Sequence, residues 1–238
     1  MVINVDKTKT MVISSKNDDL TWNPELTAGG EPIEPTKNYR FLGVSIDGGL
    51  RFTEHANVLK KKCRSRVNIM KCMAGRDWGN SVETQRMIYI QSVRSVMEYA
   101  SAGWSSWISN TTKEQLQSIQ NQGLRAVYNL AKTCPEDFLH LETGIEPIKQ
   151  RWEKNDDITW DRYVRLPDED PRKQLLYKKV PPPRLKTRLG WRHTTGSRMQ
   201  TWDILRETTR PPLQPWRELN NLRLDRVSLG KKKEEYTT

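Results

Sequence analysis

Four helix starts follow one another between residues 53 and 136, and this succession constrains the fold more than any other feature of the chain. Ser, Thr and Asn side chains cap a helix by accepting hydrogen bonds from its first free N–H groups, and a Glu three positions later completes a capping box. The predicted starts are Thr53, Asn80 with Glu83, Thr111 with Glu114, and Thr133 with Glu136. Because short segments separate them, the sequence predicts a small helical bundle.

The predicted helices carry apolar residues at helical spacing, which is the pattern of a buried face. The first stripe consists of Leu59, Cys63, Val67, Met70 and Met73 and ends at Gly75. The second consists of Val82, Tyr89, Val93, Val96, Met97, Ala100 and Trp104. The third consists of Leu116, Ile119, Leu124, Val127 and Leu130. Because Trp104 continues the second stripe, packing in the core is favoured over base stacking for Trp104 and Trp107.

Strands are predicted before the first helix. Apolar residues on both sides of the polar segment 6–9 predict a β-hairpin within residues 1–15. Residues 39–47 predict one further strand, in which Gly43 leaves one face open for close approach, and Gly48 and Gly49 turn the chain after it. A lone hairpin is marginal in water, so we expect sheet neighbours from a longer fold, cut before Met1. The predicted class is α+β, mostly α.

A helical extension and a basic tail are predicted after the bundle. Trp152, Ile158, Trp160 and Tyr163 anchor the extension, which breaks at residues 166–168. A run of three prolines at 181–183 ends it, and a short helix is expected near residues 199–205. We divide the chain into strands at 1–50, a helical bundle at 51–150, a helical extension at 151–180 and a basic, Pro-rich, partly disordered linker or tail at 181–238.

The charge of the chain favours a polyanionic partner. Its formal net charge is +11 and its pI is about 9.6, and clustered Lys and Arg side chains release counterions from nucleic-acid phosphates. The sequence has no apolar run long enough to cross a bilayer and no signal-peptide core at residues 1–10. We therefore expect an intracellular protein, in the nucleus or the cytoplasm, that is not secreted and has no membrane partner.

Neither the cysteines nor the histidines indicate a metal site or a disulfide framework. Cys63, Cys72 and Cys134 are too few and too far apart, so we interpret them as ordinary buried thiols. The histidines, at positions 55, 140 and 193, have no partner at metal-ligand spacing. The sequence therefore predicts no metal ligand and no cofactor held by this chain.

Three ordered motifs resemble the reverse transcriptases of non-LTR retrotransposons of the LINE, jockey-like kind. Residues 4–11 resemble the N-x-x-K-T-x-x-M element that follows the catalytic loop of the family. Residues 39–47 resemble the strand Y-x-F/Y-L-G-V-x-I-D, and Leu50, Phe52 and His55 match its continuation L-x-F-x-x-H. Further similarity continues through Trp78-Gly79, Tyr99, Trp104, residues 119–125, residues 182–188 and residues 211–216.

The resemblance implies a C-terminal fragment of an RNA-directed DNA polymerase. Residues 1–50 would be the end of the palm with the primer-grip strand, residues 51–150 the thumb, and the tail a linker toward a ribonuclease H domain. Its implied partners are an RNA–DNA or DNA primer-template duplex and the missing palm and fingers of a polymerase.

Departures from the family pattern predict that the chain alone does not polymerise. The family holds two Mg²⁺ ions with aspartates, one pair of which lies in an aromatic-Ala-Asp-Asp turn. This sequence has no such turn, because Lys16 and Asn17 precede Asp18-Asp19 where apolar and aromatic residues belong. The ribonuclease H start is also absent, since Thr195-Gly196-Ser197 lacks the aspartate of T-D-G-S. Mg²⁺ is therefore expected only in the complete polymerase.

Each candidate site residue has a structural alternative. Lys7 matches the lysine that acts as a general acid toward pyrophosphate in such polymerases, or it is a solvated turn lysine. Phe41, Leu42 and Gly43 would form the primer grip, or a buried strand with a bulge glycine. Lys60, Lys61 and Arg64, together with Lys62, Arg66 and Lys71, would contact duplex phosphates, or they form a solvated helix face.

Two hypotheses about function remain open from the sequence. The first is a reverse-transcriptase fragment that binds primer-template nucleic acid without sequence preference. The second is a basic helical module that packs against a protein partner and is tethered or localised by its tail. An unrelated enzyme has no support, because no nucleophile with its base, no phosphate loop and no metal cluster is visible in the sequence.

Overall fold

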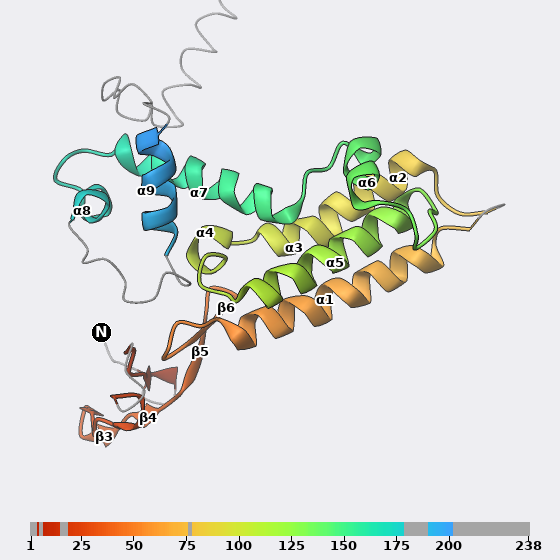
Figure 1. Ribbon diagram of the computed structural model, residues 1–238. Helices are drawn as coiled ribbons and strands as arrows, with labels where there is room; N and C mark the ends of the chain where they lie inside the picture. The colour runs from red at the N-terminus through yellow and green to blue at the C-terminus, as the bar shows by residue number, and fades with distance from the viewer. Residues whose placement is uncertain (1–3, 5–6, 15–18, 76–77, 179–189, 202–238) are drawn as a thin grey trace, which may run out of the picture.

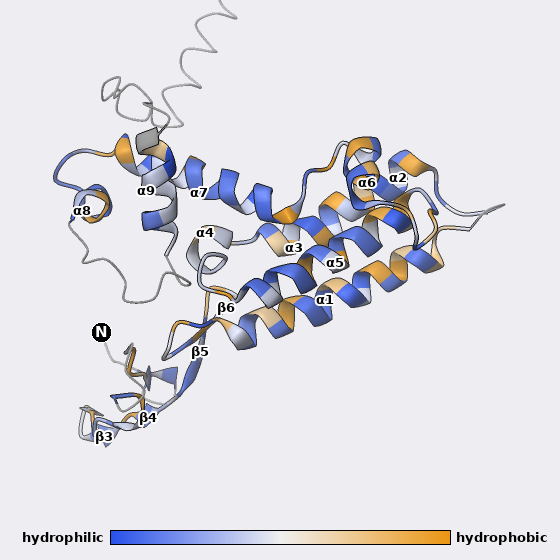
Figure 2. Ribbon diagram, in the orientation of Figure 1, coloured by the Kyte–Doolittle hydropathy of each residue, from blue (hydrophilic) through white to orange (hydrophobic). Residues whose placement is uncertain are grey.

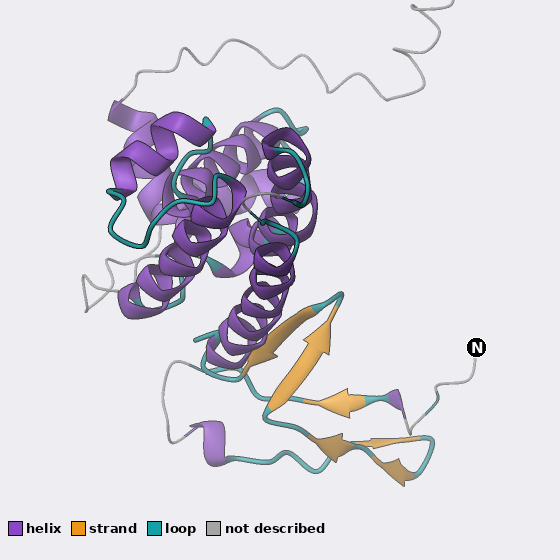
Figure 3. Ribbon diagram, turned by 90° about the vertical axis from the view of Figure 1, so that its right-hand side faces the viewer, coloured by secondary structure: helices purple, strands orange, loops and turns teal. Residues whose placement is uncertain are grey.

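The fold is an elongated helical bundle with a small region of short strands at one end (Figure 1). A computed structural model describes residues 4, 7–14, 19–75, 78–178 and 190–201. The strands lie below the start of the first helix, as Figure 3 shows from the side. The predicted class, α+β and mostly α with N-terminal strands, is confirmed. The predicted tail lies outside the described residues, except for residues 190–201.

The strands are β1 (Lys9–Thr10), β2 (Thr27–Ala28), β3 (Glu31–Pro32), β4 (Glu34–Pro35), β5 (Asn38–Phe41) and β6 (Val44–Asp47). The helices are η2 (Asp19–Thr21), α1 (Thr53–Cys72), α2 (Val82–Ile88), η3 (Tyr89–Arg94), α3 (Ser95–Glu98), α4 (Ser101–Trp104), α5 (Asn110–Val127), α6 (Glu136–Thr143), α7 (Ile148–Val164), α8 (Pro171–Tyr177) and α9 (Trp191–Thr201).

The strands form three separate two-stranded sheets among the described residues. They pair β1 with β4 in parallel, β2 with β3 antiparallel and β5 with β6 antiparallel. The first strand of the hairpin predicted within residues 1–15 lies outside the described residues, and the described strand β1 pairs with β4. A local turn precedes β1: Asn4 Oδ1 accepts a hydrogen bond from the backbone N–H of Lys7 over 3.1 Å, and the Thr8 hydroxyl donates to Asn4 O over 2.8 Å.

Residues 39–47 form a β-hairpin, which corrects the prediction of one continuous strand. Phe41 pairs with Val44, so Leu42 and Gly43 form a two-residue loop. Both loop residues have positive φ, 45° at Leu42 and 87° at Gly43. This is the backbone of a type I′ turn, whose twist matches that of the two flanking strands. The hairpin therefore ends in a tip that consists of Phe41, Leu42 and Gly43.

The helices of the bundle begin close to the predicted positions, but other residues cap them. Ser81 and Ser109 accept hydrogen bonds from the N–H groups of Thr84 and Thr112, over 3.3 and 3.2 Å, in place of Asn80 and Thr111. Thr53 is already helical, because the preceding Phe52 has left-handed backbone angles. Pro135 precedes α6 without a side-chain cap, so Thr133 does not cap that helix.

The second predicted helix is interrupted twice. It starts as α2, widens into the π-helical turn η3 and ends as α3 at Glu98. Ala100, with φ of 50°, then redirects the chain into α4. The predicted core residues Tyr89, Val93, Met97 and Trp104 are nevertheless fully buried.

The core lies between α1, the α2–α3 segment and α5, whose sequences mix polar and apolar residues along their length (Figure 2). The first and third stripes supply it as predicted, and Leu59, Cys63, Val67, Met70, Leu116, Ile119, Leu124 and Val127 are all buried. Gly123 of α5 faces the ring of Tyr89. A Cβ atom at Gly123 would lie 2.8 Å from a ring carbon of Tyr89 and 3.3 Å from a methyl group of Val67. Glycine therefore permits the close approach of these helices.

The helical extension packs α7 against α9 and α8. Trp191 of α9 meets the rings of Trp160 and Tyr163 edge to face, with centroids 6.1 and 6.0 Å apart. Arg198 of α9 donates a hydrogen bond to Asp157 of α7 over 2.7 Å. The break at residues 166–168 is present, but α9 begins at Trp191, well before the predicted short helix.

The thiols differ from the prediction of three buried side chains. Cys63 is buried, and burial raises its pKa to about 11. Cys72 is exposed, because it lies on the side of α1 opposite the apolar stripe, and Cys134 is half-buried. Among the described residues, no group of three or more His, Cys, Asp or Glu side chains is placed to hold a metal ion. No described helix combines the length and the apolar character needed to cross a membrane.

Candidate nucleic-acid interface

The tip of the β5–β6 hairpin presents apolar side chains to solvent. Phe41 and Leu42 are 56% and 74% exposed, and Gly43 is exposed as well. Glycine is the residue that adopts positive φ without strain, and it has no side chain to keep a ligand away from the backbone. The structural alternative of a buried strand is therefore wrong for these three residues. Their role in binding nucleic acid stays a prediction.

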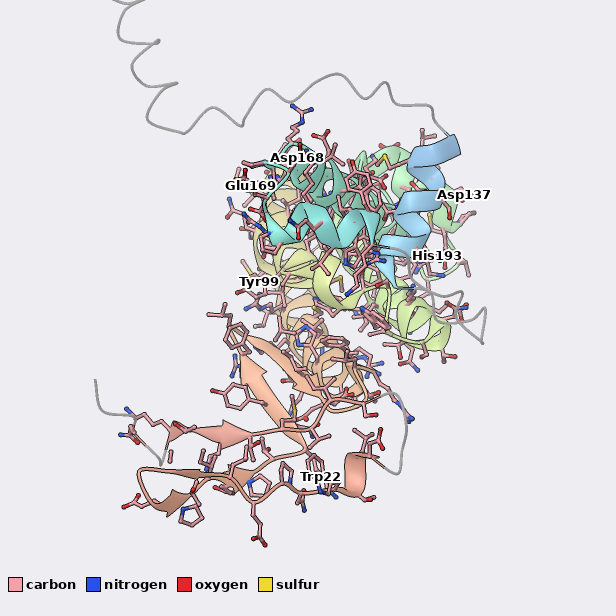
Figure 4. All side chains as sticks on the ribbon, turned by 90° about the vertical axis from the view of Figure 1, so that its left-hand side faces the viewer. Trp22, Tyr99, Asp137, Asp168, Glu169 and His193 are labelled. Atoms are coloured by element: carbon pink, nitrogen blue, oxygen red, sulfur yellow. The ribbon has the colours of Figure 1, made fainter. Side chains whose placement is uncertain are left out.

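Tyr99 holds the hairpin tip against the helical bundle. Its hydroxyl donates a hydrogen bond to Leu42 O over 2.7 Å, and its ring lies 3.4 Å from the position of a Cβ atom at Gly43. Tyr99 follows α3 directly and lies where the hairpin meets the helices (Figure 4). The sequence indicated no such role, because Leu42 and Tyr99 are far apart in the chain and no local pattern connects them.

Replacing Tyr99 by Phe removes this hydrogen bond and should free the hairpin tip. We expect a loss of about 0.5–1.5 kcal/mol in the free energy of unfolding and faster amide hydrogen exchange at Gly43 and Val44. Tyr128→Phe is the matched control, because the Tyr128 hydroxyl donates to Glu142 O over 3.0 Å, away from the hairpin. Equal exchange at the tip in the two variants would contradict a role of Tyr99 in holding it.

Strand β6 contacts α1 through His55, close to the hairpin tip. The backbone N–H of Ser45 donates to His55 Nδ1 over 3.4 Å, and the His55 ring meets Trp104 edge to face at 5.2 Å. Burial lowers the pKa of His55, and the charges of Lys62 and Arg40 lower it further. His55 is therefore neutral near pH 7, which leaves Nδ1 free to accept the bond from Ser45.

The basic residues of α1 are divided between packing and solvent. Lys60 donates a hydrogen bond to Gln115 of α5 over 2.8 Å, and Arg66 donates to Ser92 O of η3. Lys61, Lys62, Arg64 and Lys71 are exposed. Within the part of the chain that the structure describes, none of the basic residues of α1 forms an ion pair. The positive charges of the four exposed residues are therefore available to an external anion.

The predicted site residues do not form one cluster. Lys60 and Arg64 are four residues apart, so they share the side of α1 that faces α5. Lys61 follows Lys60 by one position and points about 100° away around the helix. Phe41, Leu42 and Gly43 lie instead at the hairpin, which contacts α1 on the side of His55.

Lys7 and Asp19 belong to the segment that precedes β2. Lys7 is exposed in the turn stabilised by Asn4, just before β1. Segment 9–14 runs beside the base of the hairpin, where the N–H of Ser14 donates to Gly48 O over 3.0 Å. Asp19 accepts a hydrogen bond from the Ser14 hydroxyl over 2.5 Å, whereas Asp18 lies outside the described residues. The general-acid role of Lys7 stays a prediction.

Two curated proteins match the chain, and both are named as products of transposable elements. A probable RNA-directed DNA polymerase from transposon BS of Drosophila melanogaster is 19% identical over 57% of this chain and 15% of its own length. A retrovirus-related Pol polyprotein from type-1 retrotransposable element R1 2 of Nasonia vitripennis is 22% identical over 62% of this chain and 37% of its own length. The similarity to non-LTR retrotransposon reverse transcriptases is thereby confirmed.

The chain corresponds to well under half the length of the curated relatives that it matches. No protein-family model matches the chain, and no solved structure matches it significantly.

Proposed function

We propose that this chain binds the primer-template duplex for a reverse transcriptase of the non-LTR retrotransposon kind. In this proposal the β5–β6 hairpin is the primer grip and the helical bundle is the thumb. The observation that carries the proposal is the exposed hairpin tip, with Gly43 at its turn and apolar side chains around it, beside a helix whose cations have no acidic partner in the described structure.

The chemistry of the hairpin and of α1 fits a nucleic-acid backbone. Gly43 allows a sugar-phosphate chain to approach the main chain, while Phe41 and Leu42 offer apolar contact to sugars. Lys and Arg side chains of α1 would neutralise phosphates on the duplex. None of these contacts reads a base, so binding is expected to be independent of sequence.

Catalysis of polymerisation is not assigned to this chain alone. The family reaction needs Mg²⁺ ions held by carboxylates, and the aromatic-Ala-Asp-Asp turn that would supply a pair of them is not in this sequence. Asp19 does not replace it, because it begins the helical turn η2 and its carboxylate accepts a hydrogen bond from Ser14. The donor groups do not fit the metal site, so we derive no step through it.

A titration of the full chain with a labelled RNA–DNA hybrid tests this proposal. If the protein neutralises about three phosphates, its affinity should fall about 40-fold as the salt concentration rises from about 50 to about 200 mM. The measurement is fluorescence anisotropy at several salt concentrations, with hybrids of two unrelated sequences. An affinity that does not change with salt would contradict the proposal, and a strong preference for one sequence would contradict the expected mode of contact.

A second candidate is a protein-interaction module, because the N-terminal region exposes apolar side chains. These are Ile13, Trp22, Leu26, Tyr39, Phe41 and Leu42, each at least 41% exposed. The two candidates are distinguished by truncating the chain after Val180. Retained hybrid binding favours the hairpin and bundle as the nucleic-acid site, whereas complete loss favours an interaction module with a tethering tail.

A further inference from the structure

Arg40 lies on β5, one strand away from the Ser45 backbone that contacts His55. Arg40 pairs with Ser45 across the two strands, and paired residues of an antiparallel ladder point to the same face. The backbone N–H of Ser45 donates to His55 Nδ1, so the pair lies next to the first two turns of α1. Because Ser45 is small, the long side chain of Arg40 can extend across it.

Lys62 occupies the same side of α1 as His55. The two residues are seven positions apart, and seven residues make nearly two helical turns, which leaves them within about 20° of each other around the axis. Arg40 and Lys62 both depress the pKa of His55, which agrees with their common approach to it from two different elements. Arg40, His55 and Lys62 therefore define what we call the hairpin side of α1.

Both cations on the hairpin side are available to a ligand. Arg40 and Lys62 are exposed, and neither forms a hydrogen bond or an ion pair with its side chain within the described ranges. His55 is neutral near pH 7, because burial lowers its pKa, so the positive charge on this side of α1 comes from Arg40 and Lys62. In contrast, Lys60 on the opposite side of the helix is bound to Gln115 of α5.

The hairpin side is also continuous with the predicted primer grip. Leu42, at the hairpin tip, accepts the hydrogen bond of Tyr99, and Tyr99 is 55% exposed beside it. Two exposed cations, near an exposed aromatic and an exposed apolar side chain, offer both charge and stacking surface. Nucleic acid presents phosphates together with flat bases and sugars, which suit both kinds of contact.

We propose that the phosphate backbone of the bound duplex follows the hairpin side of α1, where Arg40 and Lys62 contact it, and not the α5 side that carries Lys60 and Arg64. This inference rests on the proposed function and deepens it, because it assigns two phosphate contacts that the sequence motifs did not indicate. It also joins the hairpin tip and the thumb helix into one continuous binding surface.

Charge-matched double variants of the full chain test the inference. Arg40→Glu/Lys62→Glu should weaken binding of an RNA–DNA hybrid by at least about 10-fold and reduce the slope of log affinity against log salt by about two, since each phosphate contact contributes about 0.9. Lys60→Glu/Arg64→Glu changes the net charge by the same amount and should weaken binding about threefold or less. The conservative double variant Arg40→Lys/Lys62→Arg keeps both positive charges and should bind the hybrid about as tightly as the wild type does.

The outcomes separate this inference from the proposed function. An equal or larger loss from Lys60→Glu/Arg64→Glu overturns the inference and leaves the proposed function intact. No loss from either double variant contradicts both, because the bundle would then contribute no phosphate contact. Thermal unfolding of each variant shows whether it has folded, and a polyglutamate competitor that displaces the hybrid as well as a second hybrid does would overturn the assignment to nucleic acid.

Discussion

Replacing Trp104 by alanine is expected to lower the free energy of unfolding by about 3–5 kcal/mol. Trp104 is fully buried and lies between His55 of α1 and Trp152 of α7, meeting each ring edge to face with centroids 5.2 Å apart. Its indole N–H donates to Tyr99 O over 2.9 Å. The substitution therefore removes two aromatic contacts and a hydrogen bond and leaves a cavity where three segments meet.

Chemical denaturation of the full chain measures this loss. Trp22→Ala is the matched control, because Trp22 is 64% exposed and its removal should cost less than about 1 kcal/mol. Trp104→Phe keeps a ring but not the N–H, so it should fall between the two. A loss for Trp104→Ala no larger than that of the control would show that the ring stack does not support the bundle.

The stability of the chain should decrease as the pH rises from about 4 to about 7, because of Asp156. Asp156 lies on α7 and is 5% exposed, and its Oδ1 atom has no hydrogen-bond partner among the described residues. Burial raises its pKa to about 7, and Asp157 and Glu153 on the same helix add to this rise. Arg198 of α9 and Lys113 of α5 oppose it without cancelling it.

The free energy of unfolding falls with rising pH because the folded state keeps a proton on Asp156 that the unfolded state has lost. Between the pKa of an unfolded aspartate, about 3.9, and the folded value, the folded chain binds more protons than the unfolded chain, so raising the pH favours unfolding. Three pKa units correspond to about 4 kcal/mol at most, and partial solvation reduces this to about 2 kcal/mol.

Asp156→Asn should therefore raise the stability at pH 7.5 by about 2 kcal/mol and have little effect near pH 4. The measurement is the difference in free energy of unfolding between variant and wild type at several pH values, which cancels the titration of other groups. Asp157→Asn is the contrasting control, since it removes the ion pair with Arg198 and should destabilise α9. A difference between Asp156→Asn and wild type that does not change with pH would contradict the assignment.

The helical bundle could be predicted from the sequence because its signals are local. Stripes such as Leu59, Cys63 and Val67 repeat at helical spacing, and their burial follows from that repeat. The caps were less predictable, because Asn80 and Ser81 are adjacent and both suit the position. The backbone path into α2 determines that Ser81, and not Asn80, accepts the capping hydrogen bond from the N–H of Thr84.

The hairpin could not be predicted because its decisive contacts are distant. Leu42 is not a usual turn residue, and the letters of residues 39–47 suit one long strand as well as two short ones. The hydrogen bond from Tyr99 and the bond between Ser45 and His55 join segments far apart in the chain. The pairing of β1 with β4 also joins segments far apart in the chain, so no local pattern indicates it.

The sequence does not show which cations of α1 face a ligand, since charge alone does not indicate the side of a helix. It points first to Lys60, Lys61 and Arg64, yet Lys60 is bonded to α5. Lys62 stands in the sequence only as a further member of the run. Its place beside His55 depends on how the hairpin contacts the helix, which no pattern in the sequence indicates.

The contact between Gly123 of α5 and Tyr89 of η3 restricts which residues can occupy these two positions. Because a Cβ atom at Gly123 would lie within 2.8 Å of the Tyr89 ring, a larger residue at 123 is compatible only with a smaller one at 89. Related chains should therefore change these two positions together or keep both. Such paired change would trace the descent of this bundle even among relatives whose overall identity is as low as 19%.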